Sequence, residues 1–188
     1  MTANAAVKQS PLAAVAFPAG LREVPFLAQI GLRADLSDPH VAKRLGEVLG
    51  LELPHEPNTT SCSTDLCALW LGPDEWLIIG PPDTESALEE RCRTGLDSAC
   101  GSVVDVSADR TTVEVWGREA PAILETGCAL DLHHRRFAAG RSAQTLVARV
   151  PVILYQLTGE PRFRLLVRRS LAPYLAAWLE DARSGLHG

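Results

Sequence analysis

Two stretches of the chain repeat one order of segments, and this repetition limits the possible folds more than any other feature. Residues 69–88 and 154–175 each contain an apolar strand, a turn with Gly, a return strand opened by Trp or Phe, and a helix. A strand, a helix and a long loop come before each stretch. Gene duplication followed by fusion explains such a pattern most simply.

The repeated unit also predicts the fold class. Two helices on the same side of a mostly antiparallel sheet form a split-βαβ-like half. We therefore predict an α+β fold made of two duplicated halves, with the helices packed on one side of each sheet. The predicted boundaries are a flexible N-terminal arm over residues 1–22, a first half over 23–100 and a second half over 101–184.

The N-terminal segment is apolar but differs from a secretory signal. Pro11 and Pro18 interrupt it, and only Lys8 precedes it, whereas a signal usually has an unbroken apolar region after a basic stretch. We expect a loose arm rather than a signal peptide. Such an arm would expose three apolar side chains unless a partner covered them: Leu12, Val15 and Phe17.

The most strongly specified element is a helix over residues 39–49. Asp38 is a natural N-cap, Pro39 loses no hydrogen bond at the first helical position, and Gly50 can adopt the left-handed conformation that ends a helix. The predicted strands cover residues 27–34, 66–71, 76–80, 102–106, 111–116, 144–157 and 162–167. Loops are predicted at 52–65 and 130–142, and a turn at 158–161. Three further helices are predicted: one that ends near Gly95, one over 118–126, and one that begins after a cap at Ser170.

Composition and cysteine spacing exclude several classes of protein. Hydrophobic residues make up 46% of the chain, enough for a core, but no apolar run approaches the roughly 18 residues that span a bilayer. Five cysteines at irregular spacing do not form the even set of a secreted disulfide framework. Cys62 and Cys67 lack the second pair that a zinc site needs. We expect reduced thiols and a cytoplasmic protein.

The charges are distributed unevenly. The net charge is −5, yet residues 132–179 hold eight arginines and one acid, Glu160. This asymmetry suggests one positive face, and an ordinary solvated strand face is the equal alternative. RNA binding is a weaker interpretation, because the chain has only Lys8 and Lys43 as lysines and its aromatic content is 5%.

Motifs that carry chemistry are absent from the sequence. It contains no phosphate loop, no dinucleotide fingerprint and no nucleophile elbow. His133 and His134 are adjacent, which is a poor spacing for a metal pair. Asp105 and Asp109 lie at a strand end and a turn, where Asp is common for structural reasons. We therefore predict no catalytic, cofactor-binding or metal-binding residues in this chain.

The hairpin at residues 70–76 allows two interpretations. Its tryptophans could fill a partner's pocket, or they could form a cross-strand pair in the core of the hairpin. The acids at its tip should be solvated unless a partner arginine meets them. With the arginines of the second half, the candidate subunit-interface residues are Trp70, Asp74, Glu75, Trp76, Arg135, Arg136 and Arg141.

Three segments carry a resemblance to a known family: LWLGPDEWL at 69–77, VDVS at 104–107, and the stretch from Gly140-Arg141 to Arg149-Val150-Pro151. Over about residues 25–182 the chain resembles the gamma subunits of heterotetrameric sarcosine oxidase. Residues 102–182 also look like the folate-binding fold of aminomethyltransferases. Those enzymes carry acidic residues at the start of a late strand to activate folate, whereas the matching residues 150–153 here are apolar.

The resemblance implies a role in an assembly. That oxidase demethylates sarcosine oxidatively to glycine, with hydrogen peroxide and methylenetetrahydrofolate formed by its large subunits. The resemblance places FAD, FMN, NAD and tetrahydrofolate in the large subunits and zinc in the smallest. It implies that this chain is a non-catalytic accessory subunit without a cofactor, with alpha, beta and delta subunits as partners. The alternative is a free-standing folate-binding or aminomethyltransferase-like domain.

Overall fold

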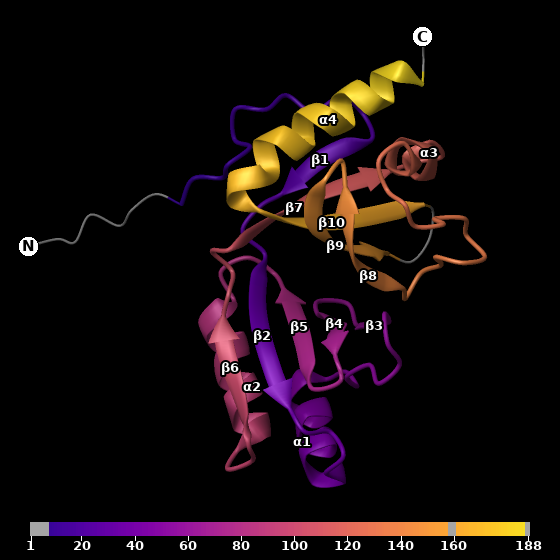
Figure 1. The fold of residues 1–188 in the computed structure, drawn as a ribbon. Coiled ribbons are helices and arrows are strands. Elements are labelled where there is room, and N and C mark those ends of the chain that lie inside the picture. The colour runs from indigo at the N-terminus through magenta and orange to yellow at the C-terminus, as the bar shows by residue number, and fades with distance from the viewer. Residues whose placement is uncertain (1–7, 158–160, 187–188) are drawn as a thin grey trace, which may run out of the picture.

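The computed structural model describes residues 8–157 and 161–186, which form two stacked five-stranded sheets with helices on their outer sides (Figure 1). The lower sheet has the order β3 (Thr60–Cys62), β4 (Cys67–Gly72), β5 (Glu75–Gly80), β2 (Ala28–Ala34) and β6 (Gly101–Asp105). The upper sheet has the order β1 (Leu21–Val24), β7 (Arg110–Trp116), β10 (Arg162–Arg168), β9 (Val150–Gln156) and β8 (Ser142–Val147). The helices are α1 (Pro39–Leu49), α2 (Glu85–Leu96), α3 (Ala120–Glu125) and α4 (Ala172–Gly185), the last preceded by the short 3₁₀ helix η1 (Arg169–Leu171).

The two sheets have the same topology. Starting from one edge, the strands run β6, β2, β5, β4, β3 in the lower sheet and β1, β7, β10, β9, β8 in the upper one. All neighbouring strands are antiparallel in both sheets. The predicted α+β fold with antiparallel sheets is confirmed, and the duplication of the halves extends to the order of their strands.

The halves exchange their first strands. β1 precedes β2 in the chain, but it pairs with β7 of the upper sheet, with Leu21 opposite Val115. β6 precedes β7, but it pairs with β2 of the lower sheet, with Val103 opposite Leu32. Each half therefore completes the sheet of the other. β6 lies within the predicted second half (101–184) but belongs to the lower sheet, and β1, which spans the boundary between the predicted arm (1–22) and the predicted first half (23–100), belongs to the upper sheet.

Part of the predicted N-terminal arm is packed on the second half. Leu12 and Leu21 are each only 2% exposed and belong to the hydrophobic core beneath α3 and α4. Val15 and Phe17 are partly buried against the same core. The prediction that these apolar side chains are exposed is therefore wrong, because the second half covers them. The first seven residues of the predicted arm lie outside the described residues.

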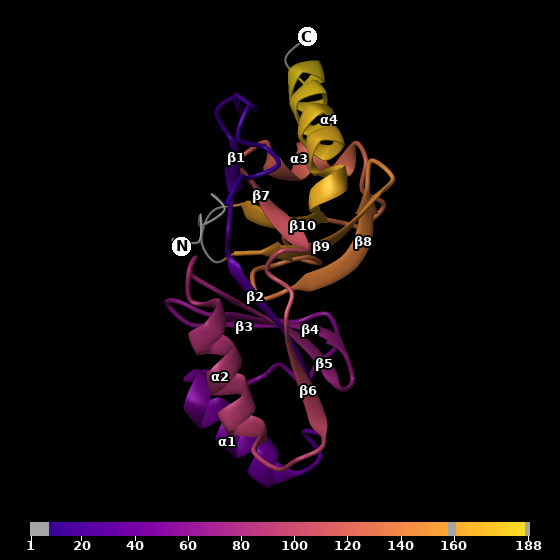
Figure 2. The same cartoon turned by 90° about the vertical axis from the view of Figure 1, so that its left-hand side faces the viewer.

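Three hydrophobic cores hold the layers together. One lies between the upper sheet and α3 and α4, and another lies between the lower sheet and α1 and α2. The third lies between the two sheets and joins Leu69, Leu77 and Ile79 to Ile153, Tyr155 and Leu166. Burying a large apolar side chain contributes about 1.5–3 kcal/mol, so this third core fixes one half on the other. Figure 2 shows the two sheets and their outer helices from a second direction.

Local signals predicted α1 correctly. The Asp38 carboxylate accepts a hydrogen bond from the backbone N–H of His40 at 2.8 Å, which caps the helix at its N-terminus. Gly50 adopts φ 64°, the left-handed conformation that ends the helix. Both features follow from the residue types at those positions.

Three local predictions are corrected. The strand expected over 144–157 is the hairpin β8–β9, whose turn residues Ala148 and Arg149 have φ values of 50° and 69°. The loop expected over 52–65 contains β3. Ser170 does not cap the last helix, because it lies within η1 and α4 begins at Ala172. Residues 158–160 of the predicted turn lie outside the described residues.

In the described part of the chain, none of the helices combines the length and the apolar character needed to cross a membrane.

Candidate interaction surface

The two tryptophans of the β4–β5 hairpin have different environments. Trp76 is 1% exposed and packs in the core of the lower half, and its Nε1 donates a hydrogen bond to the Pro54 carbonyl at 2.8 Å. Trp70 lies opposite Trp76 in the strand register and is partly buried against the same core. Trp76 is thus a core residue, as in the second interpretation of the hairpin, and its assignment to a subunit interface stays a prediction that its burial does not favour.

The acids at the hairpin tip are paired within the chain. Arg33 on β2 contacts the Asp74 carboxylate at 3.5 Å and the Glu75 carboxylate at 2.8 Å. Arg33 and Glu75 are direct neighbours in the β2–β5 register. The arginine that meets these acids therefore comes from this chain, and the tip is solvated as expected, since the side chains of Asp74 and Glu75 are 62% and 38% exposed. All three side chains keep contact with solvent.

Arg141 joins the two halves. Its guanidinium lies 2.9 Å from the Glu56 carboxylate, and both side chains are largely exposed. Backbone bonds accompany this pair: the Thr60 N–H donates to the Gly140 carbonyl at 2.8 Å, and the Ser142 N–H donates to the Asn58 carbonyl at 2.9 Å. In this chain Arg141 is therefore occupied at a contact between its own halves.

Arg135 and Arg136 occupy an exposed loop with buried ends. The loop connects α3 to β8, and Leu132 and Phe137, which flank its tip, are 1% and 7% exposed. The His133 carbonyl accepts hydrogen bonds from the N–H groups of Arg136 and Phe137, at 2.7 and 3.0 Å. Within the described ranges, neither arginine side chain forms an ion pair. This basic loop, residues 133–136, is the surface feature best suited to meet an acidic partner.

The other arginines of the second half do not all lie on one face. Arg169 donates a hydrogen bond to the Gln9 carbonyl at 2.6 Å. Arg162 and Arg164 turn toward Glu114, a carboxylate that is completely buried. The arginines of residues 132–179 are therefore spread over internal contacts, the basic loop and separate exposed positions such as Arg149 and Arg168.

The buried charge cluster around Glu114 was not predicted from the sequence. Its carboxylate lies 2.7 Å from an Arg22 nitrogen, 3.0 Å from Arg164 Nε and 3.8 Å from Arg162 Nε. Arg164 also donates a hydrogen bond to the Tyr155 hydroxyl at 3.2 Å. Burial raises the pKa of Tyr155 above its usual value, so this hydroxyl stays protonated. The alternating sequence TTVEVW could have indicated this burial. Neighbouring residues of a strand point to opposite faces of the sheet, so Glu114 lies on the other face from Val113 and Val115.

A cleft of about 570 Å³ opens between the two sheets beside this cluster. The β3–β4 hairpin and the ends of β9 and β10 line it. Cys62 and Cys67 lie in this lining and form a disulfide, whereas Cys92, Cys100 and Cys128 are free. The expectation that all five cysteines are reduced thiols is corrected for this pair, because the hairpin register places the two residues directly opposite each other.

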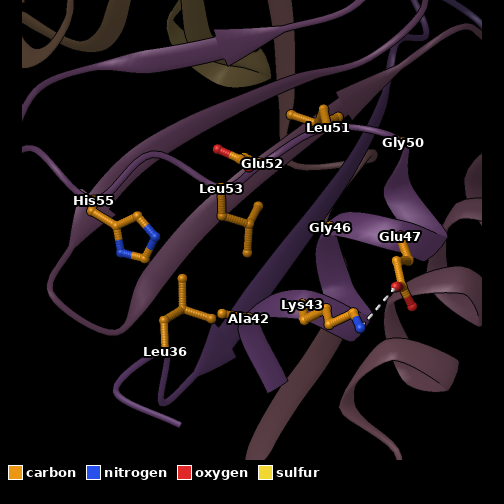
Figure 3. Close-up of a pocket in the computed structure, with 10 residues that line it drawn as sticks. All are labelled: Leu36, Ala42, Lys43, Gly46, Glu47, Gly50, Leu51, Glu52, Leu53 and His55. Carbon is orange, nitrogen blue, oxygen red and sulfur yellow. Dashed lines mark ion pairs between the residues drawn. The ribbon is translucent and has the colours of Figure 1, made fainter. Parts of the chain in front are cut away.

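A second hollow, of about 580 Å³, lies along α1 (Figure 3). Leu36, Leu53 and His55 surround it on one side, and the Lys43–Glu47 pair lies on the helix at its other side. The nitrogen and oxygen of that pair are 3.8 Å apart. Among the described residues, no group of three or more His, Cys, Asp or Glu side chains is arranged to hold a metal ion.

The stacked α+β halves define a class of fold that is shared with an aminomethyltransferase. The structure is similar to aminomethyltransferase T of the glycine cleavage system from Bartonella henselae, with a TM-score of 0.62 and 15% identity over 85% of this chain and 45% of that chain. At this level of identity, the likeness shows the fold alone.

Sequence and structure together give the family. The chain belongs to the sarcosine oxidase, gamma subunit family, whose model matches residues 33–185. It is 38% identical to the sarcosine oxidase subunit gamma of Corynebacterium sp. (strain P-1) over 87% of this chain and 79% of that protein. The structure matches a chain of the heterotetrameric sarcosine oxidase from Corynebacterium sp. U-96, solved in complex with pyrrole 2-carboxylate. That match has a TM-score of 0.86 and 32% identity, and it covers 96% of this chain and 97% of that chain. The family resemblance read from the sequence is confirmed.

Proposed function

We propose that this chain is a non-catalytic accessory subunit of a heterotetrameric sarcosine oxidase. The observation that carries the proposal is the likeness in sequence and structure to a chain of such an oxidase, which covers nearly the whole length of both chains. The fold fits this role, because the third core and the exchanged strands hold the two halves together as one rigid surface.

The proposed assembly contains alpha, beta and delta subunits and resides in the cytoplasm. It demethylates sarcosine oxidatively to glycine, and its large subunits form hydrogen peroxide and methylenetetrahydrofolate. FAD, FMN, NAD, tetrahydrofolate and zinc are assigned to those partner subunits. The three free cysteines suit a reducing compartment, while the Cys62–Cys67 disulfide closes only a short turn.

We assign the docking contact to the basic loop. Arg135 and Arg136 are exposed, and their loop is fixed at both ends by the buried side chains of Leu132 and Phe137. A loop that is already ordered loses little conformational entropy on binding, so its charges can act on a partner's acidic surface efficiently. Asp74 and Glu75 keep contact with solvent at the hairpin tip of the lower half, where Arg33 reduces their negative charge, and Trp70 is only partly buried.

Co-purification tests both the assembly and the docking loop. A tagged full chain, co-expressed with the other subunits, should retain a yellow, flavin-absorbing complex on the affinity column. The double variant R135E/R136E should lose most of the flavin absorbance while the tagged chain keeps its own thermal unfolding midpoint. R149E is the matched control, because Arg149 is an exposed arginine in the β8–β9 turn, away from this loop. Retention of the complex by R135E/R136E would refute the docking assignment, and the absence of any yellow complex would refute the assembly.

A free-standing folate-binding domain remains the alternative function. The fold of this chain is similar to that of aminomethyltransferase T. However, β9 begins with Val150, Pro151 and Val152 and offers no carboxylate there to activate folate. Calorimetric titration of the isolated full chain with tetrahydrofolate separates the two functions. The accessory-subunit proposal expects no heat of binding at tens of micromolar, and a saturable heat would favour the folate-binding domain.

A further inference from the structure

Both halves line the cleft between the two sheets. The lower half contributes the apolar side chains of Leu27, Leu66 and Ile79 together with the polar residues of the disulfide hairpin. The upper half contributes Gln156, Leu157, Arg162 and Arg164 from the ends of β9 and β10. Sites for small organic ligands combine apolar side chains with polar groups that fix the orientation of the ligand, and about 570 Å³ is within the usual size range.

The wall contributed by the upper half has more positive than negative charge. Three arginines, Arg22, Arg162 and Arg164, surround the single buried carboxylate of Glu114. Glu114 can neutralise only one of them. Among the described lining residues Asp65 is the one acid, and it lies in the exposed β3–β4 turn on the opposite half. The Arg162/Arg164 wall is therefore suited to receive a further negative charge.

The two lining arginines differ in how fully their nitrogens are used. Arg164 donates from Nε to Glu114 and from Nη1 to Tyr155, and its side chain is 21% exposed. Arg162 makes one long contact to Glu114, at 3.8 Å from Nε, and its side chain is 45% exposed. Arg162 thus has terminal donors available, and a guanidinium can hold a carboxylate through two parallel hydrogen bonds.

Gln156 supplies an independent sign of a ligand. The residue is 9% exposed and lines the cleft, yet its Oε1 is buried without a hydrogen-bond partner among the described residues. Buried polar side-chain atoms in folded proteins nearly always have a partner. Since rotation of the amide exchanges its oxygen and its NH₂ group, Gln156 can accept from or donate to a molecule in the cleft.

We infer that this cleft binds a small organic anion in which a carboxylate is attached to an apolar body. The carboxylate lies against Arg162, with Arg164 behind it, and a neighbouring polar group of the ligand satisfies Gln156. The apolar body lies against Leu27, Leu66 and Ile79. This site belongs to the accessory chain itself and does not depend on the assembly proposed above.

Hippurate is a suitable probe, because it joins a phenyl ring, an amide and a carboxylate. Hippuramide is its neutral analogue, and inorganic phosphate is an anion without an apolar body. Binding of each to the purified full chain is measured by calorimetry, with thermal unfolding as a second readout. We expect saturable hippurate binding that raises the unfolding midpoint, at least tenfold weaker binding of hippuramide, and no comparable binding of phosphate.

Variants test the assigned residues. R162Q should weaken hippurate binding at least tenfold, and Q156L should weaken it several-fold. R168Q is the matched control, because Arg168 is an exposed arginine of the same strand outside the cleft lining. It should bind hippurate like the unaltered chain. The unliganded unfolding midpoint of each variant shows that it is folded. Absence of hippurate binding, equal binding of hippuramide or phosphate, or an unchanged affinity in R162Q would each overturn the inference.

Discussion

Glu114 on β7 accepts a hydrogen bond from Nε of Arg164 on the neighbouring strand β10 at 3.0 Å, and the Glu114 side chain has no contact with solvent. From the other side of β7, Arg22 on β1 donates to the same carboxylate at 2.7 Å. β1 precedes β2 of the lower sheet in sequence but pairs with β7, so the strand exchange delivers the arginine that helps neutralise this buried acid. The duplicated architecture and the charge cluster therefore depend on each other.

Breaking the Glu114–Arg164 pair should destabilise the chain strongly. In R164L the carboxylate stays buried with a weaker set of partners, and loss of one member of a buried ion pair typically costs about 3–5 kcal/mol. Urea unfolding of the full chain, followed by tryptophan fluorescence, measures this loss. The double variant E114Q/R164L should be less destabilised than the sum of E114Q and R164L by about 0.5–3 kcal/mol. Strict additivity would show that the two side chains do not interact in solution.

Trp76 and Trp70 should respond very differently to truncation. Trp76 is 1% exposed and donates a hydrogen bond to Pro54, so W76A creates a cavity and should cost about 3–5 kcal/mol. Trp70 is only partly buried, so W70A should cost clearly less. W76F removes the hydrogen bond, which contributes about 0.5–1.5 kcal/mol, and part of the buried ring, so it should cost less than W76A. The free energy of unfolding in denaturant checks all three values, and equal losses for W70A and W76A would contradict the assigned environments.

Gly46 in α1 and Gly95 in α2 form a matched pair for which substitution by Ala should change the stability in opposite directions. A Cβ at Gly95 in α2 would lie 2.7 Å from Leu45 Cδ2 and 2.9 Å from Val48 Cγ2, because α1 and α2 pack closely there. G95A should therefore destabilise the chain by about 1–3 kcal/mol. A Cβ at Gly46 in α1 has only the Leu51 carbonyl nearby, at 3.9 Å. G46A should stabilise by about 0.5–1 kcal/mol through helix propensity. Thermal unfolding of both variants shows whether each substitution raises or lowers the stability of the chain. Stabilisation by G95A would disprove the close contact between α1 and α2.

The sequence predicted the elements that local chemistry determines. Asp38 and Gly50 defined α1, since capping depends on residues next to the helix end. The β8–β9 turn was missed, because Ala148 and Arg149 are not residues that usually adopt positive φ. The basic loop residues Arg135 and Arg136 were singled out correctly as exposed arginines, but their role stays a prediction.

Long-range contacts explain most of what sequence reasoning missed. Glu114 is 92 residues from Arg22 and 50 from Arg164, so no local pattern links the three. The burial of Leu12 in the second half depends in the same way on a partner surface far along the chain. For Trp76 the sequence left two interpretations open, an interface residue or a core residue, and only the packing of distant elements shows that it lies in the core of the lower half.

Thiol labelling should separate the five cysteines into three groups. Without reductant, a maleimide at pH 7 should modify Cys100, which is the exposed free cysteine, while Cys92 and Cys128 are buried. Burial raises the pKa of the Cys92 thiol to about 11, so even a reagent that reached it would find almost no thiolate at neutral pH. The Cys92 thiolate fraction should increase about tenfold per pH unit below that pKa.

Mild reduction should add Cys62 and Cys67 to the labelled set, because their disulfide closes a hairpin at the surface. Mass spectrometry of tryptic peptides identifies each site. C100A is the control that should remove the fast label, and labelling of Cys62 or Cys67 without reductant would show that the pair exists as free thiols.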